Sequence, residues 1–282
     1  MPRVTVIIPT YNWSEVLPYS IGSVLNQSYR DFELLVIGDA CTDDSADVVA
    51  RVGDARTRWI NRAENWGQAA GPYNDGLREA RGEIIAHLAH DDLWLPHHLE
   101  VMVKGLEREA SVAYGLAAYI DRDGAAPRPG PRRAHEYHPG KAIPPANVVV
   151  WRELALRIGG WRHYRELDTW PDTDMWNRLH AADPRFRFVP RLTVVRFPAD
   201  KRKDVYKQRP SHEQKQWFER IRTEPDLEPR LLAEMAVNLQ PPARPPTWRE
   251  KLAARLRGRK TGDLHFFEER RAFKGLAPKP GA

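Results

Sequence analysis

Short apolar runs rich in β-branched residues recur through the first half of the chain, and a stretch with helical spacing of apolar residues follows each of the first two. The run at 4–8 ends at Pro9, and the run at 32–37 ends at a Gly-Asp pair. Two further runs, 58–60 and 83–88, continue the alternation. Strands that alternate with helices of this length predict an α/β domain with a mostly parallel central sheet flanked by helices on both faces.

The second half of the chain predicts the remaining elements. Segments 113–120 and 147–151 have the composition of strands, and the Pro-, Gly- and Arg-rich stretch 122–141 between them predicts a mobile loop near a site. Beyond them we expect one helix, two short strands and a helical hairpin, at 173–182, 186–189, 193–197 and 211–239.

Basic charge is concentrated at the C-terminal end. Of the 44 Lys and Arg residues, eleven lie in 241–282, together with four of the 38 Asp and Glu residues. The preceding residues carry 33 basic against 34 acidic side chains, which argues against a nucleic-acid footprint on the folded domain. In the extension, Trp248, Leu252 and Leu256 recur among basic side chains and predict a short helix that contacts an anionic membrane. The alternatives are that this short helix docks on the domain or that it frays.

Location is predicted from what the sequence lacks. Residues 1–9 lead directly into a strand without the regions of a signal peptide, and no run approaches the ~18 apolar residues of a membrane span. The single cysteine, Cys41, excludes an internal disulfide. We predict a cytoplasmic protein, with the basic tail as a candidate for peripheral contact with the inner face of the membrane.

Polar and aromatic residues follow four of the predicted strands. Ligands of open α/β sheets bind outside the carboxyl ends of the strands, so these segments are expected to converge on one edge. They supply an aromatic face, amides and paired carboxylates, which suit a nucleotide base, a ribose and a metal-bound diphosphate. The predicted nucleotide-binding residues are Pro9, Thr10, Tyr11, Asn12, Asp39, Asn65, Gly67 and His90.

Signatures of other nucleotide-binding classes are missing. The chain has no G-x-x-x-x-G-K-[ST] loop and no G-x-G-x-x-G after its first strand, so P-loop hydrolysis and NAD chemistry lose support. Without a glycine-rich cradle, a diphosphate is usually neutralised by a hard cation such as Mn²⁺ or Mg²⁺. Asp91 is the first candidate ligand and Asp92 the second; the alternative is a solvated turn in which Asp92 caps the next helix.

The motifs occur in an order that resembles the family 2 glycosyltransferases with the GT-A fold, a Rossmann-like α/β fold. They begin with Val-Ile-Ile-Pro-Thr-Tyr-Asn at 6–12 and extend over roughly the first 200 residues. The others are Gly-Asp-Ala-Cys-Thr-Asp-Asp-Ser at 38–45, Glu-Asn-Trp-Gly at 64–67, Ala-His-Asp-Asp-Leu-Trp-Leu-Pro at 89–96, Ile-Gly-Gly-Trp at 158–161 and Pro-Asp-Thr-Asp-Met-Trp at 171–176.

The resemblance implies roles for individual residues. It places Thr10, Tyr11 and Asp39 at the nucleotide base, and the family's D-x-D motif maps its metal ligand onto Asp91. Two positions depart from the family pattern: Ala89 replaces the first acid of D-x-D, which leaves metal dependence open, and Pro171 replaces the acid before Asp172.

The resemblance also implies that Asp172 is the catalytic base. The alternative reading makes this carboxylate the N-cap of the helix that follows it. Trp170 is a candidate for stacking on an acceptor sugar, or else a core residue. Asp39 taken alone would form an Asx turn, and Tyr11 taken alone would pack.

We therefore predict an inverting glycosyltransferase that moves a sugar from a UDP-, GDP- or dTDP-linked donor to a hydroxyl of a glycan or lipid-linked acceptor. Ala89 and Pro171 keep open a catalytically silent nucleotide-sugar-binding module. A sugar nucleotidyltransferase has less support, because the first strand is not followed by a Gly-rich basic loop.

The proline-rich stretch 241–246 reads as a stiff linker, so the GT-A domain is predicted to span 1–240. A Pro-rich linker and basic tail are predicted over 241–282. Within the domain we expect a nucleotide-binding half, an acceptor and catalytic half and a helical hairpin, at 1–110, 111–200 and 201–240.

Overall fold

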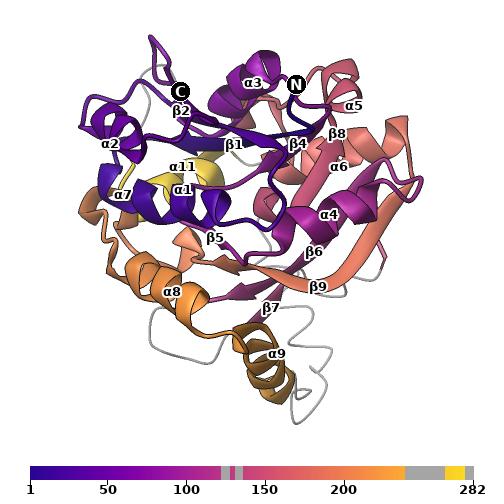
Figure 1. The fold of residues 1–282 in the computed structure, drawn as a ribbon. Coiled ribbons are helices and arrows are strands. Elements are labelled where there is room, and N and C mark those ends of the chain that lie inside the picture. The colour runs from indigo at the N-terminus through magenta and orange to yellow at the C-terminus, as the bar shows by residue number, and fades with distance from the viewer. Residues whose placement is uncertain (122–127, 131–135, 239–263, 277–282) are drawn as a thin grey trace, which may run out of the picture.

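The computed structural model describes residues 1–121, 128–130, 136–238 and 264–276, which form one sheet between two layers of helices (Figure 1). The strands are β1 (Val4–Thr10), β2 (Phe32–Gly38), β3 (Thr57–Asn61), β4 (Ile84–His87), β5 (Leu93–Trp94), β6 (Val112–Tyr119), β7 (Arg128–Gly130), β8 (Val148–Trp151) and β9 (Phe186–Arg196). The helices are α1 (Leu17–Leu25), α2 (Ser45–Val52), α3 (Ala70–Glu79), α4 (His98–Leu106), α5 (Arg152–Arg157), α6 (Pro171–Ala182), α7 (Val205–Gln208), α8 (His212–Thr223), α9 (Leu227–Asn238) and α11 (Leu264–Phe273). Short 3-10 turns lie at Ser14–Val16, Pro145–Asn147, Tyr164–Glu166 and Ala199–Lys201.

The order of the strands fixes where a ligand can bind. The order is β3-β2-β1-β4-β8-β6-β9-β5, with β7 paired to β6. Strands β1 to β4 are parallel, whereas β8 runs antiparallel to both β4 and β6. The chain moves outward from β1 through β2 to β3 and then returns to the other side of β1 at β4. This reversal is the switch point at which open α/β sheets bind their ligands.

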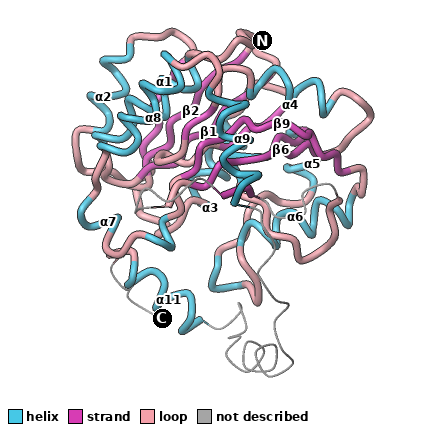
Figure 2. The backbone as a smooth tube through the Cα atoms, turned by 90° about the horizontal axis from the view of Figure 1, so that it is seen from below, coloured by secondary structure: helices cyan, strands magenta, loops and turns pink. Residues whose placement is uncertain are grey.

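Successive residues of β1 face opposite layers. Val6 and Ile8 belong to the core with α1, α2 and α4, while Ile7 belongs to the core with α3, α5 and α6. Every residue of β1 and β2 is buried, as expected for parallel strands covered on both faces. The view in Figure 2 shows α1, α2 and α4 on one side of the sheet and α3 and α6 on the other. The predicted α/β fold class is confirmed.

Two predictions about strands are wrong. The two short strands expected at 186–189 and 193–197 are one strand, β9, which continues through Pro190. Its pairing with β6 shifts register around Leu116, and such an irregularity accommodates a proline that has no N–H for the ladder. The stretch 122–141 was expected to be a loop, yet Arg128–Gly130 pairs with β6 as β7; residues 122–127 and 131–135 lie outside the described part of the chain.

The C-terminal part divides into a confirmed hairpin and a docked helix. Helices α8 and α9 pack Trp217, Ile221 and Leu231 against β5 and β9. Helix α11 returns to the domain, where the backbone N–H of Tyr206 donates to the carbonyl of Lys274 at 2.8 Å. The predicted boundary at residue 240 and the segment around Trp248 lie outside the described residues, so the domain limits and the membrane contact stay predictions.

Removing a large aromatic side chain from the buried face of α6 is expected to destabilise the fold strongly. Trp176 is fully buried, donates its indole N–H to the carbonyl of Ile143 at 2.7 Å and meets Trp161 edge to face. The Trp176→Ala variant should lower the free energy of unfolding by about 3–5 kcal/mol, measured by urea denaturation. The exposed Trp66 offers the control: Trp66→Ala should lose less than about 1 kcal/mol, and equal losses would contradict the assignment of the core.

Candidate active site

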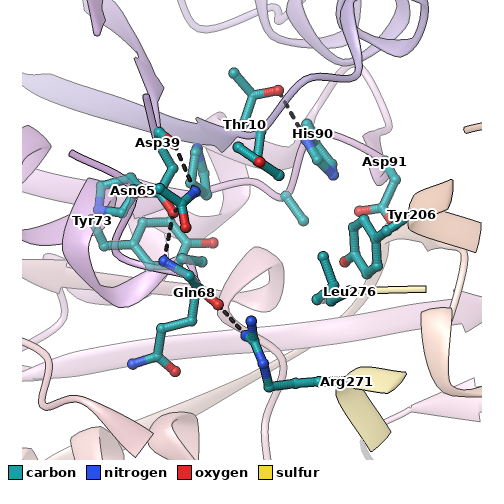
Figure 3. A pocket seen from close by; sticks show the side chains of 16 residues that line it. Thr10, Asp39, Asn65, Gln68, Tyr73, His90, Asp91, Tyr206, Arg271 and Leu276 are labelled. Carbon is teal, nitrogen blue, oxygen red and sulfur yellow. Dashed lines mark hydrogen bonds between the residues drawn. The ribbon is translucent and has the colours of Figure 1, made fainter. Parts of the chain in front are cut away.

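A pocket of about 350 Å³ lies at the carboxyl ends of β1, β2 and β4, at the switch point of the sheet (Figure 3). Segments far apart in the chain supply its walls. Its lining residues are Pro9, Thr10, Tyr11, Asp39, Asn65, Gly67, Gln68, Ala69, Pro72, Tyr73, Ala89, His90, Asp91, Tyr206, Arg271 and Leu276. Seven of the eight residues predicted to bind nucleotide are among them; Asn12 is outside this set.

Asp39 organises the loop that follows β3. Its carboxylate accepts hydrogen bonds from the backbone N–H of Trp66 at 2.7 Å, the N–H of Gly67 at 2.9 Å and the side-chain amide of Asn65 at 3.0 Å. Arg62 lies 3.5 Å from one of its oxygens. Asp39 is buried and still borders the pocket. It therefore shapes the wall against which a base would lie.

Replacing Asp39 by asparagine should weaken nucleotide binding. The two oxygens of Asp39 each accept a hydrogen bond from one backbone N–H of the loop, that of Trp66 or that of Gly67. Asparagine has only one oxygen, so one of these N–H groups would face the NH₂ group of the new side chain and lose its acceptor. Losing a charge-assisted bond of this kind corresponds to about 1.5–3 kcal/mol, so isothermal titration should show the Kd for nucleoside diphosphate rise about 10- to 100-fold. The exposed Asp47 on α2 provides the matched change: Asp47→Asn should leave Kd unaltered.

Thr10 and His90 join the ends of β1 and β4. The His90 Nδ1 atom lies 3.0 Å from the Thr10 hydroxyl, and the imidazole meets the Trp13 ring edge to face at 5.0 Å. Burial lowers the pKa of His90, so the ring is neutral at pH 7. The imidazole, held by Thr10, therefore gives the pocket a polar surface. It offers no positive charge to a phosphate group.

The two adjacent acids, Asp91 and Asp92, have different surroundings. Asp91 borders the pocket. Asp92 accepts a hydrogen bond from the backbone N–H of Phe197 at 3.0 Å and lies 3.6 Å from the Arg196 guanidinium. Burial, followed by the negative charge of Asp91, raises the pKa of Asp92. The carboxylate of Asp92 is therefore engaged by residues at the end of β9, whereas the carboxylate of Asp91 is available to a ligand.

The residues offer a minimal metal site. In the described part of the chain, no three His, Cys, Asp or Glu side chains gather as a cation cluster. Ala89, in the position of the missing acid, supplies only a methyl group to the lining. Mg²⁺ is nevertheless often held by one or two carboxylates with substrate phosphates and water completing the shell. Asp91 alone fits that arrangement.

Asp172 does not border the pocket. It occupies the first turn of α6, where Trp170 is the N-cap and Asp172 accepts from the N–H of Thr173 at 2.9 Å. Burial raises the pKa of its carboxyl, while the positive charge of Arg196 opposes that shift. Arg196, which lies 3.6 Å from Asp92, therefore also favours the ionised form of Asp172.

Two other predicted residues have partners away from the pocket. The Asn12 backbone lies in the left-handed region, with φ of 46°. Its side-chain oxygen accepts a hydrogen bond from the N–H of Thr42 at 2.7 Å, which joins the loops after β1 and β2. The Trp170 ring has the Arg270 guanidinium 5.2 Å from its centroid and Phe267 edge-on at 5.0 Å. Helix α11 thus packs on the indole that was expected to stack on an acceptor sugar.

Sequence reasoning missed the wall formed by the C-terminal half. Tyr206 lines the pocket, as do Arg271 and Leu276, which lie within the stretch predicted to be a tail. Gln68 and Tyr73 were also missed. For Tyr73, a signal was available: it follows Gly67 at the start of a predicted helix that begins at the carboxyl edge of the sheet. For Arg271 the linear sequence gave none.

A mixed sheet whose parallel strands β1 to β4 hold this pocket at their switch point has the architecture of a GT-A glycosyltransferase. The chain belongs to glycosyl transferase family 2: residues 5–165 match the family described as "Glycosyl transferase family 2". Its similarity to individual members of the family is modest.

Among curated proteins, the chain is 36% identical over 121 residues to the Escherichia coli UDP-Glc:alpha-D-GlcNAc-diphosphoundecaprenol beta-1,3-glucosyltransferase WfgD, covering 43% of this chain and 47% of that protein. It is 30% identical over 186 residues to the putative glycosyltransferase EpsE of Bacillus subtilis, covering 63% and 66%. The chain spans half or less of the length of the first curated relatives that it matches.

Solved structures share the fold at low identity. Staphylococcus aureus TarS 1-349 in complex with UDP-GlcNAc has a TM-score of 0.62 and 17% identity, covering 85% of this chain and 72% of that one. The mannosyltransferase PcManGT from Pyrobaculum calidifontis, in complex with GDP-Man and Mn²⁺, has a TM-score of 0.54 and 21% identity, covering 98% and 84%. No helix among the described residues is long and apolar enough to cross a bilayer.

Proposed function

We propose that this protein transfers a sugar from a nucleoside diphosphate sugar to a hydroxyl group of a glycan or lipid-linked acceptor, with inversion at the anomeric carbon. The observation that carries the proposal is the convergence of the loops after β1, β2, β3 and β4 on one pocket. This pocket combines an aromatic side chain, Tyr11, with the Asp39-ordered loop and one open carboxylate, Asp91. These are the groups needed for a base, a ribose and a diphosphate.

The donor is proposed from the pocket and the named relatives together. WfgD and WfaP are named for UDP-Glc, TarS was solved with UDP-GlcNAc and PcManGT with GDP-Man. The similarity to WfgD and WfaP covers 43% and 44% of this chain, a length comparable with its predicted nucleotide-binding half. A UDP-linked hexose is therefore the first donor to test, with GDP- and dTDP-linked sugars next.

The proposed chemistry is a single displacement. The acceptor hydroxyl gives its proton to the carboxylate of Asp172 as its oxygen bonds to the anomeric carbon. The bond between that carbon and the phosphate oxygen breaks on the opposite face, and the nucleoside diphosphate leaves with the electron pair. Holding both substrates against the rigid end of the sheet supplies the orientation that such a step needs.

Asp91 is proposed to hold a divalent cation, Mn²⁺ or Mg²⁺, together with the donor phosphates. A bound cation would stabilise the negative charge that develops on the leaving diphosphate. Asp92 is left out of this shell because Arg196 and the N–H of Phe197 already engage it. The cation that PcManGT binds is named as Mn²⁺.

The acceptor is proposed from relatives alone. WfgD and WfaP are named for a GlcNAc-diphosphoundecaprenol acceptor, a lipid-linked glycan. Such a substrate would bring the enzyme to a membrane surface, where the basic residues of 241–282 would be attracted to anionic lipid. Cytoplasmic location with peripheral membrane contact is proposed on this basis.

A catalytically silent binding module is the second candidate, because Ala89 removes one acid and Asp172 does not border the described pocket. One series of measurements tests both. Thermal shifts should identify the nucleoside diphosphate that binds, with and without Mn²⁺. Release of that diphosphate from its sugar in the presence of a diphospho-lipid glycan supports the transferase. Tight binding without turnover supports the module, and absence of any nucleotide binding contradicts both.

A further inference from the structure

The C-terminal segment 264–276 forms one side of the proposed donor pocket. Arg271 on α11 donates a hydrogen bond from its guanidinium to the carbonyl of Gly67, in the loop that Asp39 orders. At the last residue of the helix, the carbonyl of Phe273 accepts a hydrogen bond from the N–H of Asp204 at 2.7 Å. In Figure 3, Arg271 and Leu276 face the pocket from the side opposite Thr10 and His90.

The electrostatics of the lining single out Arg271. Among the described residues that line the pocket, it is the one with a permanent positive charge, while Asp39 and Asp91 carry negative charge. His90 is neutral because its pKa is lowered by burial. A nucleoside diphosphate brings further negative charge, which must be balanced inside a partly closed site. A guanidinium presents five donors in a fork that matches two phosphate oxygens.

Arg271 is also held in place before any ligand arrives. Glu268, one helical turn earlier, lies 3.5 Å from its Nε atom, and Glu268 accepts a hydrogen bond from the Tyr164 hydroxyl at 2.5 Å. The guanidinium lies over the Tyr164 ring, 5.5 Å from its centroid. Only 13% of the Arg271 side chain is exposed. Such pre-positioning lowers the entropy lost when a ligand binds.

We propose that Arg271 binds the diphosphate of the donor, so that α11 from the C-terminal extension completes the donor site. This inference rests on the proposed function. Arg271 would then neutralise part of the negative charge of the diphosphate, a task for which a D-x-D motif uses a metal ion. In this chain one acid of that motif is replaced by Ala89.

The segment is also held beyond Arg271. The N–H of Tyr206, a residue of the lining, donates to the carbonyl of Lys274 at 2.8 Å, which fixes the backbone of the segment beside the pocket.

The test compares ligands with and without phosphates. Using the full chain, isothermal titration should measure Kd for UDP, GDP, dTDP and the corresponding nucleosides, in the presence and absence of Mg²⁺. For the base that the wild type prefers, Arg271→Met should raise the Kd of the diphosphate about 10- to 100-fold. The Kd of the nucleoside should stay within about two-fold, and Arg271→Lys should recover part of the lost affinity.

Arg270 supplies the matched control, because it is the neighbouring arginine on α11 and pairs with Asp200 at 3.1 Å, away from the described lining. Arg270→Met should leave both constants unaltered. If Arg271→Met weakens nucleoside and diphosphate equally, Arg271 only braces the Gly67 loop and the inference is overturned. An unchanged diphosphate Kd overturns it as well. Failure of the wild type to bind any nucleotide would instead remove the proposed function.

Discussion

Replacing Asp172 by asparagine is expected to lower kcat for sugar transfer by about 10²- to 10⁴-fold, the usual contribution of a positioned general base. The amide keeps the size of the side chain and its acceptor for the N–H of Thr173, but it cannot take the proton of the acceptor hydroxyl. Donor affinity should be unchanged, because Asp172 does not border the described pocket. Steady-state kinetics and titration with the donor nucleotide measure the two effects separately.

The dependence on pH gives a second signature of the same residue. Burial raises the pKa of Asp172 above 3.8, the ordinary value. A base works only when ionised, so kcat/KM should fall as the pH drops through this raised pKa, at a higher pH than an exposed aspartate would give. The residual activity of Asp172→Asn should lack this acidic limb.

Asp168 provides the control for the Asp172 experiment. It is exposed, precedes α6 and permits the identical chemical change. Asp168→Asn should keep wild-type kcat and the wild-type pH profile. If Asp172→Asn behaves like Asp168→Asn, the base must be sought elsewhere; if Asp172→Asn loses donor binding together with turnover, the carboxylate supports the fold of the site instead.

The strands β1 and β2 were predictable because they are buried on both faces. The runs 4–8 and 32–37 are apolar apart from Thr5 and Glu33, so their type and order can be read without knowledge of tertiary contacts. The same reasoning failed at β9, where exposed Arg187 and Arg191 alternate with buried positions around Pro190. Pro190 suggested that the strand ends there, but pairing with β6 on both sides of the proline keeps β9 a single strand.

The donor pocket was predictable only where it is built from loops that directly follow strands. The parallel sheet brings Thr10, Asp39 and Asp91 together because each lies at the carboxyl end of its strand. Arg271 reaches Gly67 across 204 residues of chain, after a proline-rich stretch that suggests separation from the domain. No periodicity or motif encodes that contact, since it depends on the tertiary docking of α11.

Asp91→Asn is expected to lower kcat/KM by about 10²- to 10³-fold, because the carboxylate proposed to hold a divalent cation would be lost, and with it the stabilisation that such a cation would give to the leaving diphosphate. The asparagine should also abolish the additional thermal stabilisation that Mn²⁺ gives in the presence of nucleoside diphosphate. Thermal shift with EDTA or Mn²⁺, alongside initial rates, measures both. Asp91 is chosen for this experiment because it borders the pocket, whereas Asp92 does not.

Asp92→Asn is the control for Asp91→Asn, because it makes the same chemical change at the adjacent residue. Its carboxylate is engaged by Phe197 and Arg196, so Asp92→Asn should lower stability while the response to Mn²⁺ persists. Ala89→Asp, which restores the missing acid on the pocket wall, should strengthen that response. If Asp91→Asn retains full Mn²⁺ stimulation, the cation is not held there. If no form of the protein responds to Mn²⁺, including Ala89→Asp, neutralisation of the diphosphate must come from cationic side chains of the protein, of which Arg271 is the one in the described lining.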